Sequence, residues 1–288
     1  MTRSLRLAAI PVVLCIALVV PAAALAVGSP RLAAVQVALR AKRLYSGTVD
    51  GLPGPATKAA LVALQQHAGL PPDGVAGPQT IAALGPLAGP ELGTRPLLPR
   101  AVGGDVVQLQ FLLAWHGFPS GAFDGTFGAH TQAALVRFQR WAGLPALGVV
   151  GPSTVDALHD PIPTCPVPLA WPVRTTVGDR FGPRGAGFHP GIDLPAPPGT
   201  PVRAAAVGKV TFAGPTAGGY GNLVVVKSAG GVATMYAHLS RIVAYRGEPV
   251  TVGSLLGLVG ASGEATGPHL HFEVRLRGAA VDPLPALR

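Results

Sequence analysis

The sequence predicts a multidomain α and β protein, in which two small three-helix bundles are followed by an all-antiparallel β domain. Three observations support this fold class. Residues 35–84 match residues 109–158 without a gap, and their apolar positions have helical spacing. Beyond a proline-rich stretch, the apolar pattern changes to the period of two that is typical of strands. The length of 288 residues also suits more than one domain.

The composition excludes several classes of protein. Hydrophobic residues make up 49% of the chain, which is enough to build cores and argues against disorder. The 39 glycines and 31 prolines are spread along the sequence, which excludes a coiled coil. The glycines have no three-residue period, which excludes collagen. Only one long apolar run occurs, so a membrane protein with several spans is excluded.

That apolar run lies at the N-terminus and predicts a secretory signal peptide over residues 1–26. Arg3 and Arg6 precede the run, and an Ala-Leu-Ala segment at its end offers a cleavage site. An uncleaved membrane anchor is the alternative, but Pro11 and Pro21 interrupt the run. We therefore expect cleavage, a secreted protein and no membrane attachment afterwards.

The predicted mature chain keeps a single thiol, Cys165, so no intramolecular disulfide can form. Its net charge stays positive and is dispersed, which suits an anionic polymer such as a cell wall. The sequence has no basic cluster interleaved with aromatic residues, so we expect no nucleic-acid partner. Nothing fixes the oligomeric state, and a monomer is favoured.

The duplicated segments predict two helical domains over residues 31–86 and 105–158, joined by a linker over 87–104. Each copy has the apolar spacing of three short helices. Pro78 and Pro152 each follow a glycine and can open the last helix, where the missing N–H of proline costs nothing. We expect two separate bundles.

Both copies contain the same short motifs in the same order: a Gln-x-x-Leu segment, Asp-Gly-x-x-Gly-x-x-Thr, Gln-x-x-x-Gly-Leu and Gly-Pro-x-Thr. This order resembles the peptidoglycan-binding-like three-helix domain. The resemblance implies peptidoglycan as a partner. We interpret nearly all of the matched residues as scaffold. His67, His116 and His130 do not occupy matched positions, and we expect surface or half-buried histidines there rather than ligands.

A stiff proline-rich linker over residues 159–168 leads to the predicted β domain over residues 169–285. Gly-containing turns separate its strand-like segments, and no long helical segment interrupts them. This pattern favours antiparallel pairing, because parallel strands need long crossovers. The predicted strands are residues 207–213, 222–227, 234–239, 255–259 and 269–275.

Histidines and one aspartate form a candidate metal constellation in this domain. His189 precedes Asp193 by four residues, His269 and His271 are two apart, and His238 lies between these pairs. Residues two apart on a strand face the same side. Imidazole and carboxylate groups are zinc ligands, and a catalytic zinc site uses three of them and leaves one position open. Two histidines would then remain for proton transfer or charge stabilisation.

The surroundings of these residues contain six motifs in a fixed order: Phe-Gly-x-Arg, His-Pro-Gly-Ile-Asp-Leu, Pro-Gly-Thr-Pro-Val, Tyr-Gly-Asn, Tyr-Ala-His-Leu-Ser and Gly-Pro-His-Leu-His-Phe-Glu-Val. This order closely resembles the lysostaphin-type (LytM-like) zinc metallopeptidase family over roughly residues 171–283. The resemblance implies one zinc ion per chain, held by His189, Asp193 and His271. It also implies that His238 and His269 are catalytic, without assigning which of them is the base.

Some neighbouring residues allow more than one interpretation. Tyr220 and Tyr236 are core aromatics or cleft walls. Glu273 falls on the same strand face as His271, and it is either a partner of a histidine or an ordinary charge at a strand end. We do not expect it to be catalytic. Glycine-rich turns hold three polar residues that we interpret as turn residues: Asn222, Ser262 and Glu264.

Together these features predict a secreted, cell-wall-associated zinc metalloendopeptidase. It would hydrolyse peptide cross-links of peptidoglycan while its two helical modules bind the wall. The alternative is a catalytically inactive scaffold or hydrolase activator of the same fold, which should lack one or more of the five key residues. A purely structural zinc site would require four protein ligands, usually including cysteine. This alternative is weaker, because Cys165, the one cysteine of the predicted mature chain, lies in the predicted linker.

Overall fold

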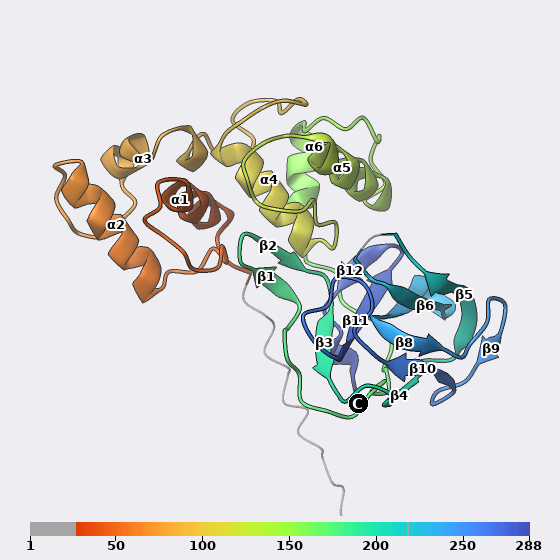
Figure 1. The fold of residues 1–288 in the computed structure, drawn as a ribbon. Helices are drawn as coiled ribbons and strands as arrows, with labels where there is room; N and C mark the ends of the chain where they lie inside the picture. The colour runs from red at the N-terminus through yellow and green to blue at the C-terminus, as the bar shows by residue number, and fades with distance from the viewer. Residues whose placement is uncertain (1–26, 218) are drawn as a thin grey trace, which may run out of the picture.

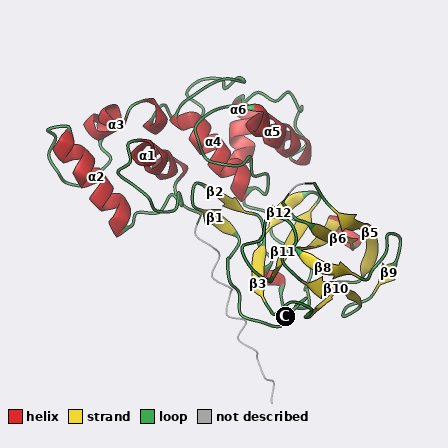
Figure 2. Ribbon diagram, viewed as in Figure 1, coloured by secondary structure: helices red, strands yellow, loops and turns green. Residues whose placement is uncertain are grey.

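A computed structural model describes residues 27–217 and 219–288. Helices make up the N-terminal half of this part of the chain and strands dominate the C-terminal half (Figures 1 and 2). The predicted signal peptide lies outside the described residues. In the described residues, we find no helix with the length and apolar character needed to span a membrane. All named strand pairs are antiparallel, as predicted.

Each copy of the repeat forms three helices. Proline opens α1, α2, α3 and α6, at the position where its missing N–H has no partner to lose. In the first copy the helices are α1 (Pro30–Ala41), α2 (Pro55–His67) and α3 (Pro78–Leu84), followed by the 3₁₀ turn η1 (Pro86–Ala88). In the second copy they are α4 (Gly104–Trp115), α5 (Ala129–Trp141) and α6 (Pro152–Leu158).

One buried glutamine ties the turn between α1 and α2. The Gln36 amide donates to the Asp50 carboxylate at 2.8 Å and to the Thr57 hydroxyl at 3.2 Å, and its oxygen accepts the Gly51 N–H at 2.8 Å. The matched residues are therefore scaffold, because they satisfy a buried amide that would otherwise be costly. The same arrangement recurs at Gln65 with Asp73, Gly74 and Thr80, at Gln110 with Asp124, Gly125 and Thr131, and at Gln139 with Gly148 and Thr154.

The two bundles are not separate, which corrects our expectation. Helix α1 packs along α4, and η1 contacts both helices. Val37 of α1 belongs to the same apolar cluster as Val107 and Phe111 of α4. Every residue of α4 is buried. A helix that is buried on all sides must be covered on all sides, and α1 and η1 supply part of the cover of α4.

The histidines of the helical half are not grouped. His67 and His130 are exposed, as expected. His116 is fully buried, which corrects the expectation of a surface or half-buried residue. It caps the C-terminal end of α4, where its Nε2 lies 3.1 Å from the Leu158 carbonyl oxygen, and burial lowers the pKa of its ring.

The predicted strand over 234–239 is interrupted at His238, because that residue adopts a left-handed φ of 60°. Its two parts belong to separate strands, β7 (Val232–Ala237) and β8 (Leu239–Ile242).

The β domain contains three sheets. The largest sheet has the order β12 (Ala279–Val281), β11 (His269–Leu276), β7 (Val232–Ala237), β6 (Asn222–Lys227), β5 (Gly208–Pro215) and β9 (Pro249–Val250), and β3 (Ile192–Pro195) also pairs with β11. The second sheet has the order β4 (Pro201–Arg203), β10 (Leu255–Val259) and β8 (Leu239–Ile242), and the third is the hairpin of β1 (Gly182–Arg184) and β2 (Gly187–His189).

The helical half packs directly against this β domain. Trp115, at the end of α4, makes edge-to-face contacts with Phe181 and Phe188, with ring centroids 6.3 and 5.4 Å apart. Backbone carbonyl oxygens at the tip of the β1–β2 hairpin accept hydrogen bonds from backbone N–H groups of both bundles. Val49 donates to Gly185 O at 2.8 Å, and Phe123 donates to Ala186 O at 2.6 Å. The hairpin therefore lies between the two halves (Figure 1).

The shared core leads to a prediction about stability. Trp115→Ala should lower the free energy of unfolding by about 3–5 kcal/mol, the usual cost of deleting a buried aromatic side chain. The loss should appear in the unfolding transitions of both the helical and the β half, followed by circular dichroism in urea. Leu147→Ala, at a position that is 71% exposed, should change stability by less than about 0.5 kcal/mol. An unchanged transition of the β half would contradict the shared core.

Candidate metal centre

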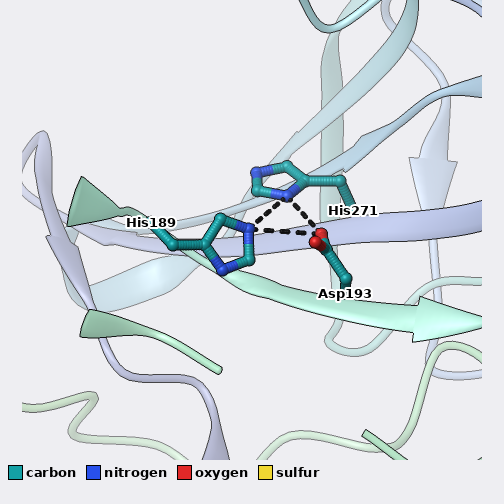
Figure 3. Close-up of side chains that lie close together, drawn as sticks. All are labelled: His189, Asp193 and His271. Carbon is teal, nitrogen blue, oxygen red and sulfur yellow. Dashed lines mark hydrogen bonds and ion pairs between the residues drawn. The ribbon is translucent and has the colours of Figure 1, made fainter. Parts of the chain in front are cut away.

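Strand pairing brings together the three predicted ligands (Figure 3). In the antiparallel pairing of β3 and β11, Asp193 lies directly opposite His271. Opposite residues of such a pair have neighbouring side chains. His189 is the last residue of β2, and the hairpin directs its ring toward the other two side chains. The three residues come from three strands, and His271 lies far in the sequence from the closely spaced His189 and Asp193.

The distances between the three side chains fit one small cation. The Nδ1 atom of His271 lies 2.8 Å from Oδ1 of Asp193 and 3.1 Å from Nε2 of His189. The same carboxylate oxygen lies 3.2 Å from Nε2 of His189. Bonds of about 2.0–2.2 Å in a tetrahedral zinc site separate the ligand atoms by roughly 3.2–3.6 Å. A zinc ion therefore requires only small adjustments of these side chains.

Hydrogen bonds on the far side of each imidazole select the nitrogen that faces the site. The Nδ1–H of His189 donates to the Arg180 carbonyl oxygen at 2.9 Å, because a carbonyl can only accept. The lone pair of this ring is then at Nε2. In His271 the Nε2–H donates to Glu273 at 3.0 Å, which leaves the lone pair at Nδ1. These are the two atoms that face Asp193, so the donor set fits zinc.

Glu273 is the buried partner of His271, which settles the two interpretations of this residue. Its side chain has no solvent exposure. It accepts hydrogen bonds from the Tyr220 hydroxyl at 2.7 Å and from Nε of Arg275 at 2.7 Å. Burial raises the pKa of Glu273, but the Arg275 charge and the His271 hydrogen bond outweigh burial and hold that pKa at about 2. The carboxylate therefore stays charged.

The charges around the ligands favour a cation. Burial raises the pKa of Asp193, but hydrogen bonds from His189 and His271 outweigh it and hold the pKa well below its usual range. Burial lowers the pKa of His271, but Asp193 and Glu273 outweigh it and raise the pKa to about 9. In the metal-free protein a proton is therefore bound to Nδ1 of His271, and a metal ion has to displace that proton.

The two histidines predicted to be catalytic line the same cleft without belonging to the ligand group. The rings of His238 and His269 have centroids 4.7 Å apart. Each Nδ1–H donates to a backbone carbonyl at 2.8 Å, His238 to Ser262 and His269 to Gly267. Each ring therefore keeps the lone pair of its neutral form at Nε2. Nε2 of His269 lies 3.5 Å from Oδ1 of Asp193.

The position of His238 follows from the break between β7 and β8. Its left-handed backbone turns the chain out of the strand. Its N–H still donates to the Tyr220 carbonyl oxygen at 2.9 Å, which fixes the turn. Burial lowers the pKa of His238, so this ring is neutral at pH 7 and can accept a proton.

A cleft of about 520 Å³ contains all five side chains. Tyr220 lines this cleft, whereas Tyr236 is fully buried, which settles their two interpretations. Glu264, expected only as a turn residue, also lines the cleft. Arg184 also lines the cleft, although no role was predicted for it from the sequence. Its guanidinium lies 3.5 Å from Oδ2 of Asp193, and its place in the Phe-Gly-x-Arg motif was the available signal.

Comparisons with protein families agree with this geometry. Residues 187–283 match the peptidase family M23. Residues 28–84 and 102–158 each match the family described as "Putative peptidoglycan binding domain". The chain therefore contains one LytM-like M23 peptidase domain preceded by two domains of the peptidoglycan-binding family.

Individual relatives share the M23 part of the chain. The DD-carboxypeptidase/endopeptidase Mpg of Neisseria meningitidis is 52% identical over 97 residues, which are 34% of this chain and 22% of that protein. The lipoprotein NlpD/LppB homolog of Pseudomonas aeruginosa is 38% identical over 118 residues, 41% of this chain and 39% of that protein. Among solved structures, the catalytic domain of lysostaphin from Staphylococcus simulans is 33% identical, with a TM-score of 0.37, over 38% of this chain and 90% of that chain. The matches thus span less than half of these two curated relatives.

The ligand set leads to a prediction about metal content. The purified chain should bind one zinc ion, and His189→Ala or His271→Ala should abolish stoichiometric binding, because two ligands hold zinc far more weakly than three. His238→Ala should retain the metal, since its ring is not a ligand. Elemental analysis after dialysis measures all three variants. Zinc retained by both ligand variants, or lost from His238→Ala, would show that the assignment is wrong.

The Glu273–His271 hydrogen bond leads to a second prediction about the metal. Glu273→Gln should weaken zinc affinity by about 10–100-fold, because carboxylate partners orient ligand rings and raise their basicity. Competition with a chromogenic chelator measures the affinity. Glu264→Gln is the matched control, since Glu264 lines the cleft without bonding a ligand. Equal affinities for the two variants would contradict the role of Glu273.

Proposed function

We propose that this chain, with its M23 domain and two domains of the peptidoglycan-binding family, is a secreted zinc-dependent peptidoglycan endopeptidase. Its β domain would hydrolyse peptide cross-links of the bacterial cell wall while the helical domains bind the polymer. One observation carries the proposal. Three ligand atoms face one point of a cleft, and the Nε2 atoms of His238 and His269 line the same cleft as acid–base groups.

Zinc in a site of this kind supplies Lewis acidity, which polarises a scissile carbonyl and activates water for attack. The residues of the chain supply the proton transfers. His238 or His269, in its neutral form, accepts the proton of the attacking water at Nε2 and becomes an imidazolium. That imidazolium then donates the same proton to the leaving amine, which returns the ring to its neutral form. The carbonyls of Ser262 and Gly267 hold both rings in the required tautomer. Hydrogen bonds of this kind position the groups before substrate arrives.

Tyr220 is less suited to proton transfer than the histidines. Its hydroxyl donates to Glu273, and burial together with the Glu273 charge raises the pKa of the phenol above its usual value. The phenol therefore stays protonated and engaged. We assign it the role of holding Glu273 in place at the wall of the cleft.

Two alternatives are less well supported. An inactive scaffold or activator should lack one of the five key residues, whereas all five are present and lie in one cleft. A structural zinc site should close with a fourth protein ligand. Within residues 27–217 and 219–288, the group that could share one ion has three members, His189, Asp193 and His271. Cys165 packs against the apolar core instead.

The wall-binding and cell-wall location parts of the proposal rest on the helical domains. Both match the peptidoglycan-binding family, and the chain carries a formal net charge of +9, which favours an anionic polymer. The names of the two curated relatives, an endopeptidase and a lipoprotein, also point to the cell envelope.

The proposal predicts that cutting and binding can be separated in the full-length chain. His238→Ala should keep its zinc and sediment with insoluble peptidoglycan, yet cut cross-links at least about 100-fold more slowly, because a proton-transfer group is lost. The wild-type rate should fall below about pH 6.5 as histidines become protonated, and chelation should abolish it. Mass analysis of released fragments from pH 5 to 9 measures the rate.

The exposed His130→Ala is the control and should behave as wild type. Cleavage that survives chelation, or that is undiminished at pH 5, would contradict the zinc mechanism. Absence of sedimentation would contradict the binding role of the helical domains.

A further inference from the structure

A second cavity extends the cleft toward the first helical domain. It has a volume of about 380 Å³ and shares two lining residues, Asp179 and Arg184, with the cleft that holds the metal ligands. Its opposite wall comes from the turn between α1 and α2, through Thr48, Asp50 and Leu52. The two cavities are therefore neighbours that meet at Asp179 and Arg184.

The wall from the first helical domain is fixed in place. Val49, between two of the lining residues, is fully buried and donates its N–H to Gly185 O at the tip of the β1–β2 hairpin. Gln36 ties the same turn to α1 through the Asp50 carboxylate. The hairpin in turn ends at His189, a ligand residue. Hydrogen bonds thus connect this turn, through the hairpin, to the metal centre.

The lining of the second cavity suits a peptide. Leu52 is 42% exposed and offers an apolar contact, and Thr48 lines the same cavity. Oδ1 of Asp50 accepts from Gln36 and from the Leu52 N–H, so Oδ2 remains for a ligand that donates N–H groups. The aromatic residues of the lining, Trp115 and Phe181, are each only 4% exposed and offer little ring face for a sugar.

We propose that the first helical domain completes the substrate cleft, and that the second cavity binds the stretch of wall peptide that continues beyond the scissile bond. This inference rests on the proposed function, because it extends the same peptide. Its occupant follows from continuity: a peptide chain at the metal ligands that passes Arg184 enters the cavity lined by Leu52. The domain thereby contributes to substrate selection as well as to attachment.

The test compares a long and a short substrate in the full-length, zinc-loaded protein. Leu52→Arg places a long charged side chain in the second cavity. We expect kcat/KM for a purified cross-linked muropeptide dimer to fall about tenfold, the usual effect of spoiling one side-chain contact. For the shortest cross-bridge peptide that the wild type cuts, kcat/KM should change by less than about twofold.

The repeat supplies the matched control. Thr126 occupies the position in the second copy that corresponds to Leu52, is exposed and lines neither cavity. Thr126→Arg should therefore behave as wild type on both substrates. Leu52→Ala, which removes the contact without adding bulk, should show a smaller loss confined to the long substrate. Zinc content and unfolding midpoint, measured for every variant, should be unchanged.

Two outcomes would overturn the inference while leaving the proposed function standing. One is an equal loss on both substrates, which would mean that the turn supports only the metal centre. The other is no loss on the long substrate. If the wild type cuts neither substrate, the proposed function is wrong and the extended cleft is wrong with it.

Discussion

The buried carboxylate of Glu273 is the constraint on which the site depends. A charged group without solvent exposure costs several kcal/mol unless it is paired and hydrogen-bonded. Arg275, Tyr220 and His271 together provide that pairing. Because Arg275 and Glu273 share strand β11 with His271, the charge balance is built into the strand that carries the ligand. The orientation of the His271 ring is thus a consequence of satisfying Glu273.

The same logic extends to the other imidazoles of the cleft. Each has one nitrogen bonded to a backbone carbonyl, so its second nitrogen has a defined role before any metal or substrate binds. Main-chain carbonyls are positioned by the fold, whereas side-chain partners could rotate. The arrangement therefore selects tautomers through the backbone, and it requires that the turns at Ser262 and Gly267 keep their conformation.

Much of this could be predicted from the sequence. The repeat and the change of apolar period predicted the helices and strands, and the spacing of His269 and His271 predicted that both face one cleft. The packing of the two halves could not be predicted, because periodicity shows that a face is apolar but not what covers it. The predominantly apolar helix that ends at Trp115 was the available signal. The role of Glu273 stayed open, because a buried and an exposed strand-end charge look alike in sequence.

The packing of the helical half on the β domain has a consequence for any polymer that both halves hold at once. A flexible linker lets a catalytic domain sample a volume around its anchor, and the effective concentration then falls as the linker lengthens. In this chain the contacts of Trp115 and of the β1–β2 hairpin hold the β domain at one fixed distance from the helical half, so that sampling does not occur. Peptide bonds at that distance from the bound helical half meet a high effective concentration of the β domain, and bonds elsewhere meet almost none. The spacing of cuts along a bound strand would then be set by the dimensions of the protein itself.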